Sequence, residues 1–198
     1  MVSAPVSGIY SQPNLQPVEK KMLLKNEFYA SYGFFSSQEL LTGFTDLLGA
    51  MFTFTEGDFK VSGVGGPIQF GYKRVLDDYL GVGITGSYTE FNSEYIKKSD
   101  KSVLFTTTNR YWAVMVKLDF YYVTNEWVQM YSGGSFGVIN WDRTQIIPDD
   151  PKPYNHNETL PSFQLNLFSL RVGKSLGGYF EFGFGTSGIY NLGVSYKF

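Results

Sequence analysis

The sequence predicts an all-β fold: an eight-stranded antiparallel up-and-down transmembrane β-barrel with a short amphipathic helix in its first long loop. Three observations predict this fold. Apolar and polar residues alternate in eight separate segments, short and long connections alternate between those segments, and 18% of the residues are aromatic while only 17% are charged. Alternation with a period of two is typical of strands whose two faces meet different surroundings. The expected strands are 26–35, 64–74, 79–92, 108–122, 126–140, 161–173, 178–184 and 188–198.

The clearest alternation lies in segment 108–122. From residue 112 onward its even positions are all apolar, whereas its odd positions include Lys117 and Asp119. Segment 161–173 is less regular, because its apolar positions change from odd to even numbers at Leu167–Phe168. A β-bulge at that point would return the apolar side chains to one face. The alternative is a strand that starts at Phe168.

The connections between the expected strands alternate in length. The long ones are 36–63, 93–107 and 141–160, the short ones lie near 76–78, 123–125 and 174–177, and 185–187 is short where the alternation calls for a long one. Short turns on one rim and long loops on the other are typical of outer-membrane barrels, with the turns in the periplasm and the loops outside. Any specific role is therefore expected in the three long loops.

The apolar face is expected to point outward, toward lipid. It carries large rings on nearly every strand, and the lumen of an eight-stranded barrel has room only for closely packed side chains. The opposite face carries Gly, Ser, Thr and a few charges, which fit inside. The alternative is a soluble lipocalin-like barrel with the apolar face inside, which would bind an apolar ligand.

Charges inside such a barrel are expected to pair, because an unpaired buried charge is costly. Arg171 and Glu181 lie at similar distances from the turn near 174–177, which predicts an ion pair between them. Lys117 and Asp119 share one strand face and are expected to join a network. These charges would stabilise a filled lumen; a path for protons or solutes is the alternative.

Composition excludes several classes of protein. The chain has no cysteine, a single histidine (His156) and a formal net charge of −2. Disulfide frameworks, thiolate metal sites and multi-histidine metal sites are therefore excluded, and an electrostatic nucleic-acid surface is not expected. No apolar run is long enough for a transmembrane helix. No cofactor and no metal ion are expected.

The first 24 residues differ in composition from the rest of the chain. They contain three prolines and lack the apolar core of a signal peptide. They are expected to form a periplasmic or disordered segment, followed by a single barrel domain over 25–198. Either the protein stays in the cytoplasm or its signal peptide has been removed, and the barrel pattern favours the second.

The end of the chain carries a second signal. Alternate residues of the last nine are apolar or aromatic and end on an aromatic residue: Tyr190, Leu192, Val194, Tyr196 and Phe198. This pattern is similar to the C-terminal signal that outer-membrane barrels present to the barrel-assembly machinery. Aromatic residues near other strand ends are expected to form girdles at the membrane surfaces.

The final 36 residues resemble the small outer-membrane β-barrel proteins of Bacteroidota. The resemblance is carried by Phe163, Gln164, Glu181, Gly183, Gly185, Gly188, Ile189, Gly193, Tyr196 and Phe198. It implies an eight-stranded barrel in a bacterial outer membrane. It implies fold and location, and no particular activity.

The first long loop carries a helix signal. Ser36 and Ser37 are suitable N-caps, and apolar residues follow at helical spacing: Leu40, Leu41, Phe44, Leu47, Leu48 and Met51. An amphipathic helix is expected over 38–51. It could lie on the membrane, cap the barrel mouth or dock a partner.

These features predict a non-catalytic outer-membrane protein with a structural or surface-interaction role. Its expected partners are membrane lipid, the barrel-assembly machinery and a protein or polysaccharide bound through the loops, and it is expected to be a monomer or a subunit of a membrane complex. The alternative is a lipid A-modifying enzyme of the deacylase or palmitoyl-transfer type. Both resemble serine hydrolases, but His156 lies in a proline-rich loop with no serine at a suitable spacing.

Overall fold

The described part of the chain contains nine strands. The computed structural model describes residues 25–40, 57–62, 65–97, 101–148, 150 and 152–198. The strands are β1 (Asn26–Phe34), β2 (Gly57–Ser62), β3 (Ile68–Asp77), β4 (Leu80–Lys97), β5 (Val103–Thr124), β6 (Val128–Ile146), β7 (Tyr154–Val172), β8 (Leu176–Gly185) and β9 (Tyr190–Lys197). In the described residues no helix is long and apolar enough to cross a membrane.

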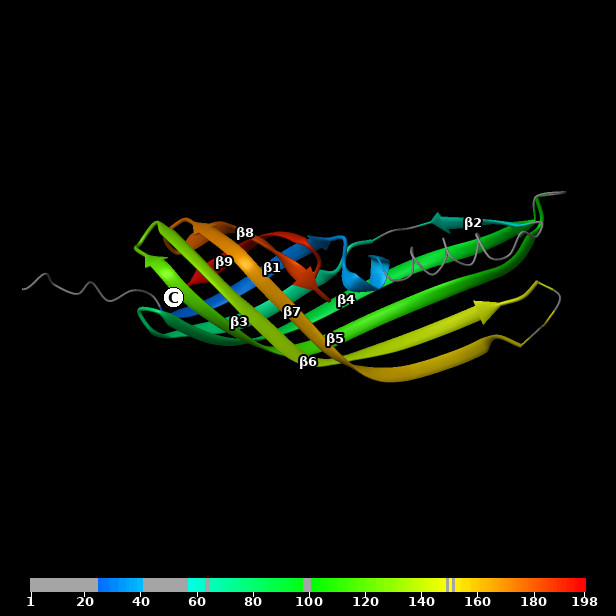
Figure 1. The fold of residues 1–198 in the computed structure, drawn as a ribbon, viewed down its shortest axis with the longest axis horizontal. Helices are drawn as coiled ribbons and strands as arrows, with labels where there is room; N and C mark the ends of the chain where they lie inside the picture. Colours follow the sequence, from blue (N-terminus) through cyan, green and yellow to red (C-terminus); the bar gives the residue numbers. More distant parts are fainter. Residues whose placement is uncertain (1–24, 41–56, 63–64, 98–100, 149, 151) are drawn as a thin grey trace, which may run out of the picture.

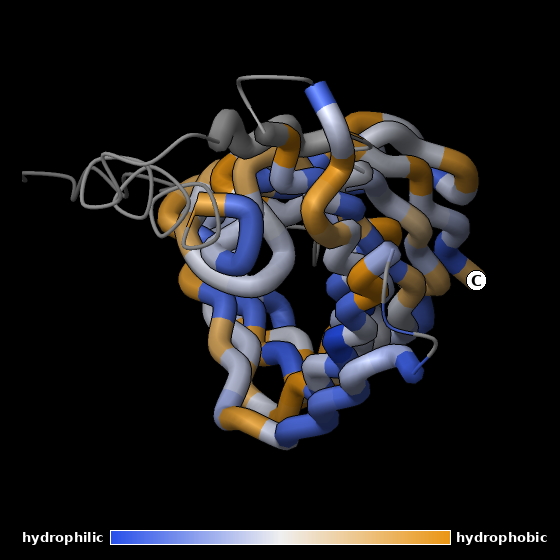
Figure 2. Tube along the Cα trace, turned by 90° about the vertical axis from the view of Figure 1, so that its right-hand side faces the viewer, coloured by the Kyte–Doolittle hydropathy of each residue, from blue (hydrophilic) through white to orange (hydrophobic). Residues whose placement is uncertain are grey.

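Eight of these strands close into a barrel. The sheet order is β2-β4-β3-β1-β9-β8-β7-β6-β5, and an additional β4–β5 pairing joins the end of the row back to β4. Every pairing is antiparallel, and β2 pairs only with β4 among the described strands. Figure 2 looks along the barrel and shows the trace closing on itself, with hydrophilic and hydrophobic residues interleaved. The predicted eight-stranded antiparallel barrel is confirmed.

The burial pattern is the reverse of a soluble protein's. Many large apolar side chains on the outer face are 36–72% exposed, for example Phe28 at 56% and Phe70 at 66%, whereas Glu27, Lys117 and Asp119 are at most 4% exposed. A folded chain presents this arrangement only where hydrocarbon surrounds it. The apolar-out prediction is confirmed, and the lipocalin-like alternative is wrong.

The bulge expected at Leu167–Phe168 is present. The β7–β8 register skips one residue between Asn166 and Phe168. As a result Asn166 and Ser169 both point into the barrel, although their numbers differ in parity. The structure thereby rules out a strand that begins at Phe168.

Four strands are longer than the sequence pattern predicted. Segments 93–107 and 141–160 were expected to be loops, but β4 and β5 are joined by 98–102 alone, and β6 and β7 by 147–153 alone. Both predicted loops are therefore wrong; they are mostly strand. β4 to β7 run 18 to 22 residues, whereas about 9–11 residues suffice to cross a bilayer. In Figure 1 their outer halves extend far beyond the ends of β1, β3, β8 and β9.

A helix begins just after β1. Residues 37–40 are helical, and Ser36 and Glu39 form a reciprocal capping box. The Ser36 N–H donates to Glu39 Oε2 at 2.6 Å, and the Glu39 N–H donates to Ser36 Oγ at 3.3 Å. Leu40 is 43% exposed. The other residues expected on this helix, Leu41, Phe44, Leu47, Leu48 and Met51, lie outside the described residues.

Candidate functional site: a closed lumen and a projecting sheet

A cluster of buried charges fills the middle of the barrel. Lys117 Nζ lies 2.5 Å from Glu181 Oε1 and 4.0 Å from Asp119 Oδ1. Lys73 Nζ lies 3.3 Å from Asp119 Oδ2 and 3.7 Å from Glu27 Oε2. These residues come from β1, β3, β5 and β8, so one network ties together opposite sides of the barrel. Buried charges persist only when paired in this way.

The expected ion pair between Arg171 and Glu181 is not formed. Arg171 pairs with Glu27, with Nε 3.1 Å from Oε1, and Glu181 pairs with Lys117. In the β7–β8 register Arg171 lies opposite Tyr179, one step nearer the turn than Ser169, which lies opposite Glu181. The guanidinium bends toward the turn while the carboxylate reaches the barrel centre, so each finds a partner from another strand.

Arg171 closes the periplasmic end of the lumen. It donates hydrogen bonds to the carbonyls of Gly173, Lys174 and Ser175, which form the β7–β8 turn, and to Ser195 on β9. It is 1% exposed. A guanidinium has five N–H donors in a planar fork, and here they hold one turn against the barrel wall from inside.

The other end of the lumen is closed by the β8–β9 turn. The Gln164 side chain accepts from the Ser187 N–H at 2.9 Å and donates to the Gly188 carbonyl at 3.0 Å. Gln69 Nε2 donates to Asn191 Oδ1 at 2.5 Å and to the Ser187 carbonyl at 3.3 Å. Thr186 and Ser187 are almost fully buried. This connection is short because it folds into the barrel mouth instead of standing above it.

Two aromatic girdles mark the limits of the lipid-facing surface. Tyr88, Trp112 and Tyr190 lie at the outer limit, and Tyr79, Tyr122 and Tyr196 at the inner limit, all between 41% and 61% exposed. From Trp112 to Tyr122, β5 advances ten residues. At about 3.3 Å per residue and a tilt of about 40°, that distance crosses roughly 25 Å of bilayer.

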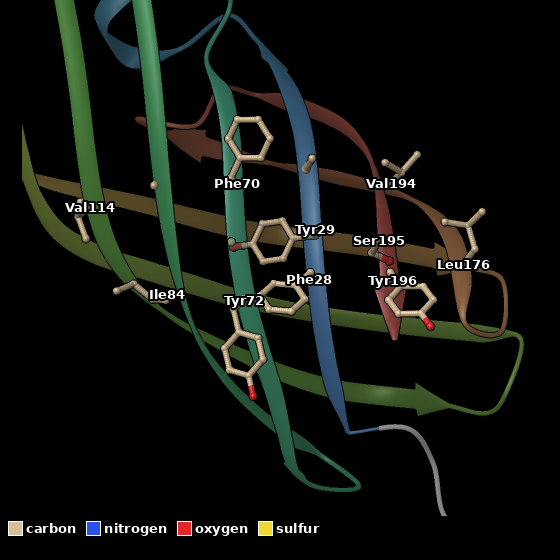
Figure 3. Close-up of a pocket in the computed structure, with 13 residues that line it drawn as sticks. Phe28, Tyr29, Phe70, Tyr72, Ile84, Val114, Leu176, Val194, Ser195 and Tyr196 are labelled. Atoms are coloured by element: carbon tan, nitrogen blue, oxygen red, sulfur yellow. The ribbon is translucent and has the colours of Figure 1, made fainter. Parts of the chain in front are cut away.

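A shallow apolar hollow interrupts the lipid-facing surface near the inner girdle. Figure 3 shows Phe28, Phe70 and Tyr72 on one side and Val194 and Tyr196 on the other. The small residues Ala30 and Gly86 also line it. Because the hollow lies within the belt, acyl chains are what it meets.

The proposed assembly signal lies on the seam between the first and last strands. β1 pairs with β9 from Glu27↔Lys197 to Phe34↔Tyr190. Tyr190, Leu192, Val194, Tyr196 and Phe198 all point outward and are 41–59% exposed. The Phe198 ring stacks on the Phe28 ring with 5.5 Å between their centroids, and the backbone N–H of Phe198 donates to the Asn26 carbonyl at 3.0 Å.

Deleting Phe198 is expected to lower the yield of folded barrel in the outer membrane several-fold while synthesis stays unchanged. The folded barrel loses ring contacts with Phe28 and Tyr196 and two backbone hydrogen bonds with Asn26 at the end of the last strand, whereas the assembly machinery loses the terminal aromatic residue. A folded barrel changes its mobility on a gel when it is boiled. The amount of this heat-shifted band in the membrane fraction, relative to total protein, measures the folded yield. Phe184→Ala, an equally exposed aromatic residue of β8, is the control. A normal folded yield after the deletion would remove the assembly role.

Outside the membrane, four strand segments form a sheet that we call the projecting sheet: β4 beyond Tyr88, β5 before Trp112, β6 beyond Asn140 and β7 before Pro161. An aromatic ladder crosses this sheet on the side that continues the lumen face. Phe91 stacks on Tyr111 at 5.4 Å, Tyr111 on Trp141 at 5.9 Å, and Trp141 meets the edge of His156 at 5.8 Å. Trp141 Nε1 also donates to Asn109 Oδ1 at 3.0 Å. Cross-strand aromatic pairs of this kind stabilise a sheet, so the ladder stiffens hairpins that have no membrane around them.

His156 lacks the surroundings of a catalytic base. Its side chain is 61% exposed, and its Nε2 lies 3.4 Å from Glu158 Oε2. Within the described part of the chain, no hydrogen bond joins it to a serine. Within the same part of the chain, no group of three or more His, Asp or Glu residues could hold a metal ion.

Comparison with known proteins identifies distant structural neighbours only. No protein-family model and no curated protein matches the chain. Two crystal structures of Ail, the attachment invasion locus protein of Yersinia pestis, are similar in fold, one of them in complex with the heparin analogue sucrose octasulfate. Their TM-scores are 0.45 and 0.47, their identities 16% and 14%, and each alignment covers 89% of this chain and 100% of the other.

The chain's own geometry determines what kind of protein it is. Closure of the sheet, the exposed apolar belt, the two girdles and the charged interior occur together only in barrels that span a membrane. Barrels of this single-chain antiparallel type belong to bacterial outer membranes. The chain is an eight-stranded β-barrel of the bacterial outer membrane.

Proposed function

We propose that this barrel is a non-catalytic surface protein that binds a partner by strand addition to its projecting sheet. The observation that carries the proposal is the free edge of β7. From Tyr154 to Phe163, β7 pairs with β6 alone among the described strands, because pairing with β8 begins only at Gln164. The edge above Pro161 is seven residues long, or about 23 Å at 3.3 Å per residue.

An edge of this kind offers main-chain hydrogen-bonding groups to another chain. Soluble proteins usually blunt such edges with lysine, proline or bulges. Here residues 154–160 contain no lysine and no bulge, and all are exposed. Extended peptides bind such edges as an additional strand. The aromatic ladder supports this role because its ring contacts across β4 to β7 stiffen the strands that carry the edge.

The partner can be trapped with a photo-crosslinking residue at Tyr154, which is 58% exposed, in the bacterium of origin. We expect a protein adduct of discrete mass, and we expect His156→Lys with Glu158→Lys to abolish it, because lysines obstruct strand addition. The same crosslinker at Lys174, in a periplasmic turn, is the positional control. The absence of an adduct at Tyr154, or an adduct that survives the lysines, would leave a purely structural role.

The closed lumen supports a role without transport. Arg171 at one end, the β8–β9 turn at the other and the ion cluster between them occupy the interior. An eight-stranded barrel leaves little space beyond its own side chains. Catalysis has no support either, since the single histidine is 61% exposed and pairs with Glu158 at the surface.

In planar lipid bilayers, the purified barrel is expected to give no stable single-channel conductance. Insertion must be verified in the same membrane, for example by protection of the belt from protease. A large porin measured in parallel is the positive control. Regular conductance steps from the native chain would contradict the filled lumen and reopen a transport role.

We also propose kinship with the small outer-membrane barrels of Bacteroidota. The shared C-terminal residues have structural tasks here that support it. Gln164 holds the inward turn, Glu181 lies in the ion cluster, and Gly185 and Gly188 have positive φ angles of 141° and 106°. Such angles favour glycine, so the motif matches the requirements of an inward-folded β8–β9 turn.

A further inference from the structure

Above Pro161, backbone N–H groups point to the free edge of β7 at three positions. The Phe163 carbonyl lies on the β8 side of β7, since it accepts from the Thr186 N–H at 3.0 Å. Main-chain groups alternate between the two sides of a strand, and the β6–β7 register has no skip from Tyr154 to Asn166. Counting back from Phe163 by twos gives the residues whose N–H groups point to the edge: Thr159, Asn157 and Asn155.

Two prolines limit this set of donors. Pro161 and Pro153 fall in the same count by twos, and neither has an N–H to donate. Asn157 lies midway between them, four residues from each. The edge therefore carries donors that are symmetric about Asn157 and that end at a proline in both directions.

A second copy of β7 can pair with this edge in an antiparallel arrangement centred on Asn157. Asn157 then lies opposite itself, and Asn155 of each copy lies opposite Thr159 of the other. Each of these pairs exchanges two backbone hydrogen bonds, so the three pairs use every one of the edge donors. Pro153 of each copy lies opposite Pro161 of the other, where neither strand has a donor.

The side chains that meet in this register are complementary. His156 of each copy lies opposite Glu158 of the other, and within one chain His156 Nε2 is already 3.4 Å from Glu158 Oε2. Tyr154 of each copy lies opposite Leu160 of the other, and these exposed side chains would cover one another. Moving one strand by two residues would replace the unlike pairs by Glu158 opposite Glu158 or by His156 opposite His156. Opposite charges across a sheet stabilise it and like charges destabilise it, so the charges select the register centred on Asn157.

We propose that the partner at the β7 edge is a second copy of this chain in a facing outer membrane. The proposal names the partner for the strand addition described above and rests on it. β7 runs from Tyr154 outside the membrane to Val172 at the periplasmic end, and all copies in one membrane point the same way. Their β7 strands are therefore parallel, whereas the self-complementary pair is antiparallel. The two-fold axis of such a pair places the second barrel beyond the tip of the first, in the membrane of another cell.

Single cysteines test the register and the facing arrangement, because the native chain has no cysteine. Two populations of the bacterium of origin carry Asn155→Cys and Thr159→Cys in place of the native chain. Opposite residues of an antiparallel pair have Cα atoms about 4.5–5.5 Å apart, which a disulfide can bridge. After mild oxidation, we expect a dimer of twice the chain mass, several-fold more abundant in the mixed populations than in either one alone. Within one population the cysteines are four positions apart, about 13 Å at about 3.3 Å per residue, which is too far for a disulfide.

Two further variants complete the test. Asn157→Cys is expected to dimerise within a single population, because it lies opposite itself. Thr108→Cys is the matched control for Thr159→Cys, since Thr108 lies on the same face of the sheet but on β5, two strands from the edge. Its mixture with Asn155→Cys should give no dimer. A heat-shifted band verifies that each variant folds, and adding His156→Lys with Glu158→Lys should abolish every dimer.

Two outcomes would overturn the proposal: no dimer in the mixture of folded Asn155→Cys and Thr159→Cys barrels, or as much dimer from Asn155→Cys alone as from the mixture. The second outcome would indicate parallel contact within one membrane. If these dimers are absent while the crosslinker at Tyr154 traps a protein of another mass, strand addition stands with a different partner. The absence of both the dimer and the Tyr154 adduct would remove strand addition as well.

Discussion

Glu181→Ala is expected to destabilise the folded barrel by about 3–5 kcal/mol, the usual cost of leaving a buried charge without its partner. Glu181 is 3% exposed. It accepts hydrogen bonds from Lys117 at 2.5 Å, from the Tyr131 hydroxyl at 2.9 Å and from Asn166 at 3.1 Å. Alanine would leave all three donors inside the barrel, with Asp119 at 4.0 Å as the nearest acid to Lys117.

Urea unfolding of the barrel in detergent or lipid bilayers measures this loss. Glu158→Ala is the matched control, because Glu158 is 47% exposed and its ion pair with His156 lies at the surface, where such pairs contribute about 0–1 kcal/mol. Glu181→Gln should fall between the two, since an amide can still accept from Tyr131. An unchanged unfolding midpoint for Glu181→Ala would show that the cluster does not stabilise the lumen.

Gly137→Ala is expected to cost about 1–3 kcal/mol or more, the range for forcing extra atoms into a packed interior. A Cβ at this position would lie 2.0 Å from the Val114 carbonyl oxygen and 2.7 Å from Met115 Cα on the neighbouring strand. Both contacts are backbone atoms, so β5 and β6 would have to separate. The barrel wall, and not a turn, therefore requires this glycine.

Gly86→Ala provides the comparison, because it makes the same chemical change on the lipid-facing side of β4. Its Cβ would meet nothing closer than 3.8 Å, so we expect a change within about 0.5 kcal/mol, as for an ordinary surface substitution. Samples are heated to increasing temperatures before a gel is run, and the temperature at which the band of folded barrel disappears ranks the stability of the two variants. Equal temperatures for both would contradict the close strand contact at Gly137.

The alternation of apolar and polar residues in the sequence marks the limits of the lipid belt more accurately than it marks the ends of the strands. The segments expected at 79–92 and 108–122 reach four residues beyond Tyr88 and Trp112, where the lipid belt ends, but β4 continues to Lys97 and β5 already begins at Val103. Beyond the belt the outer face carries mostly polar side chains, and the opposite face mixes aromatic residues such as Phe91 and Trp141 with polar ones, so the period-two signal disappears. Hydrogen bonding between strands continues regardless, and no composition rule could reveal it.

The interior charges illustrate a second limit. The sequence identified Lys117, Asp119, Arg171 and Glu181 as lumen residues, and all four are buried and paired there. It did not identify Glu27 as the partner of Arg171, because the two are 144 residues apart. Only closure of β1 against β9 brings that carboxylate to the end of β7. The similar distance of both residues from the β7–β8 turn suggested Glu181 as the partner of Arg171. The Glu181 carboxylate instead accepts hydrogen bonds from side chains of β5, β6 and β7.

The barrel, its inside-out faces, the bulge at Leu167–Phe168 and the charged residues of the lumen could all be predicted from the sequence. Each follows from local alternation, because a strand must present one kind of side chain to lipid and another to the interior. The ion-pair partners, the inward-folded β8–β9 turn and the projecting sheet with its free edge became visible only in the folded barrel. They depend on which strands become neighbours when the barrel closes, and on backbone pairing that continues where the alternation of apolar and polar residues has ended.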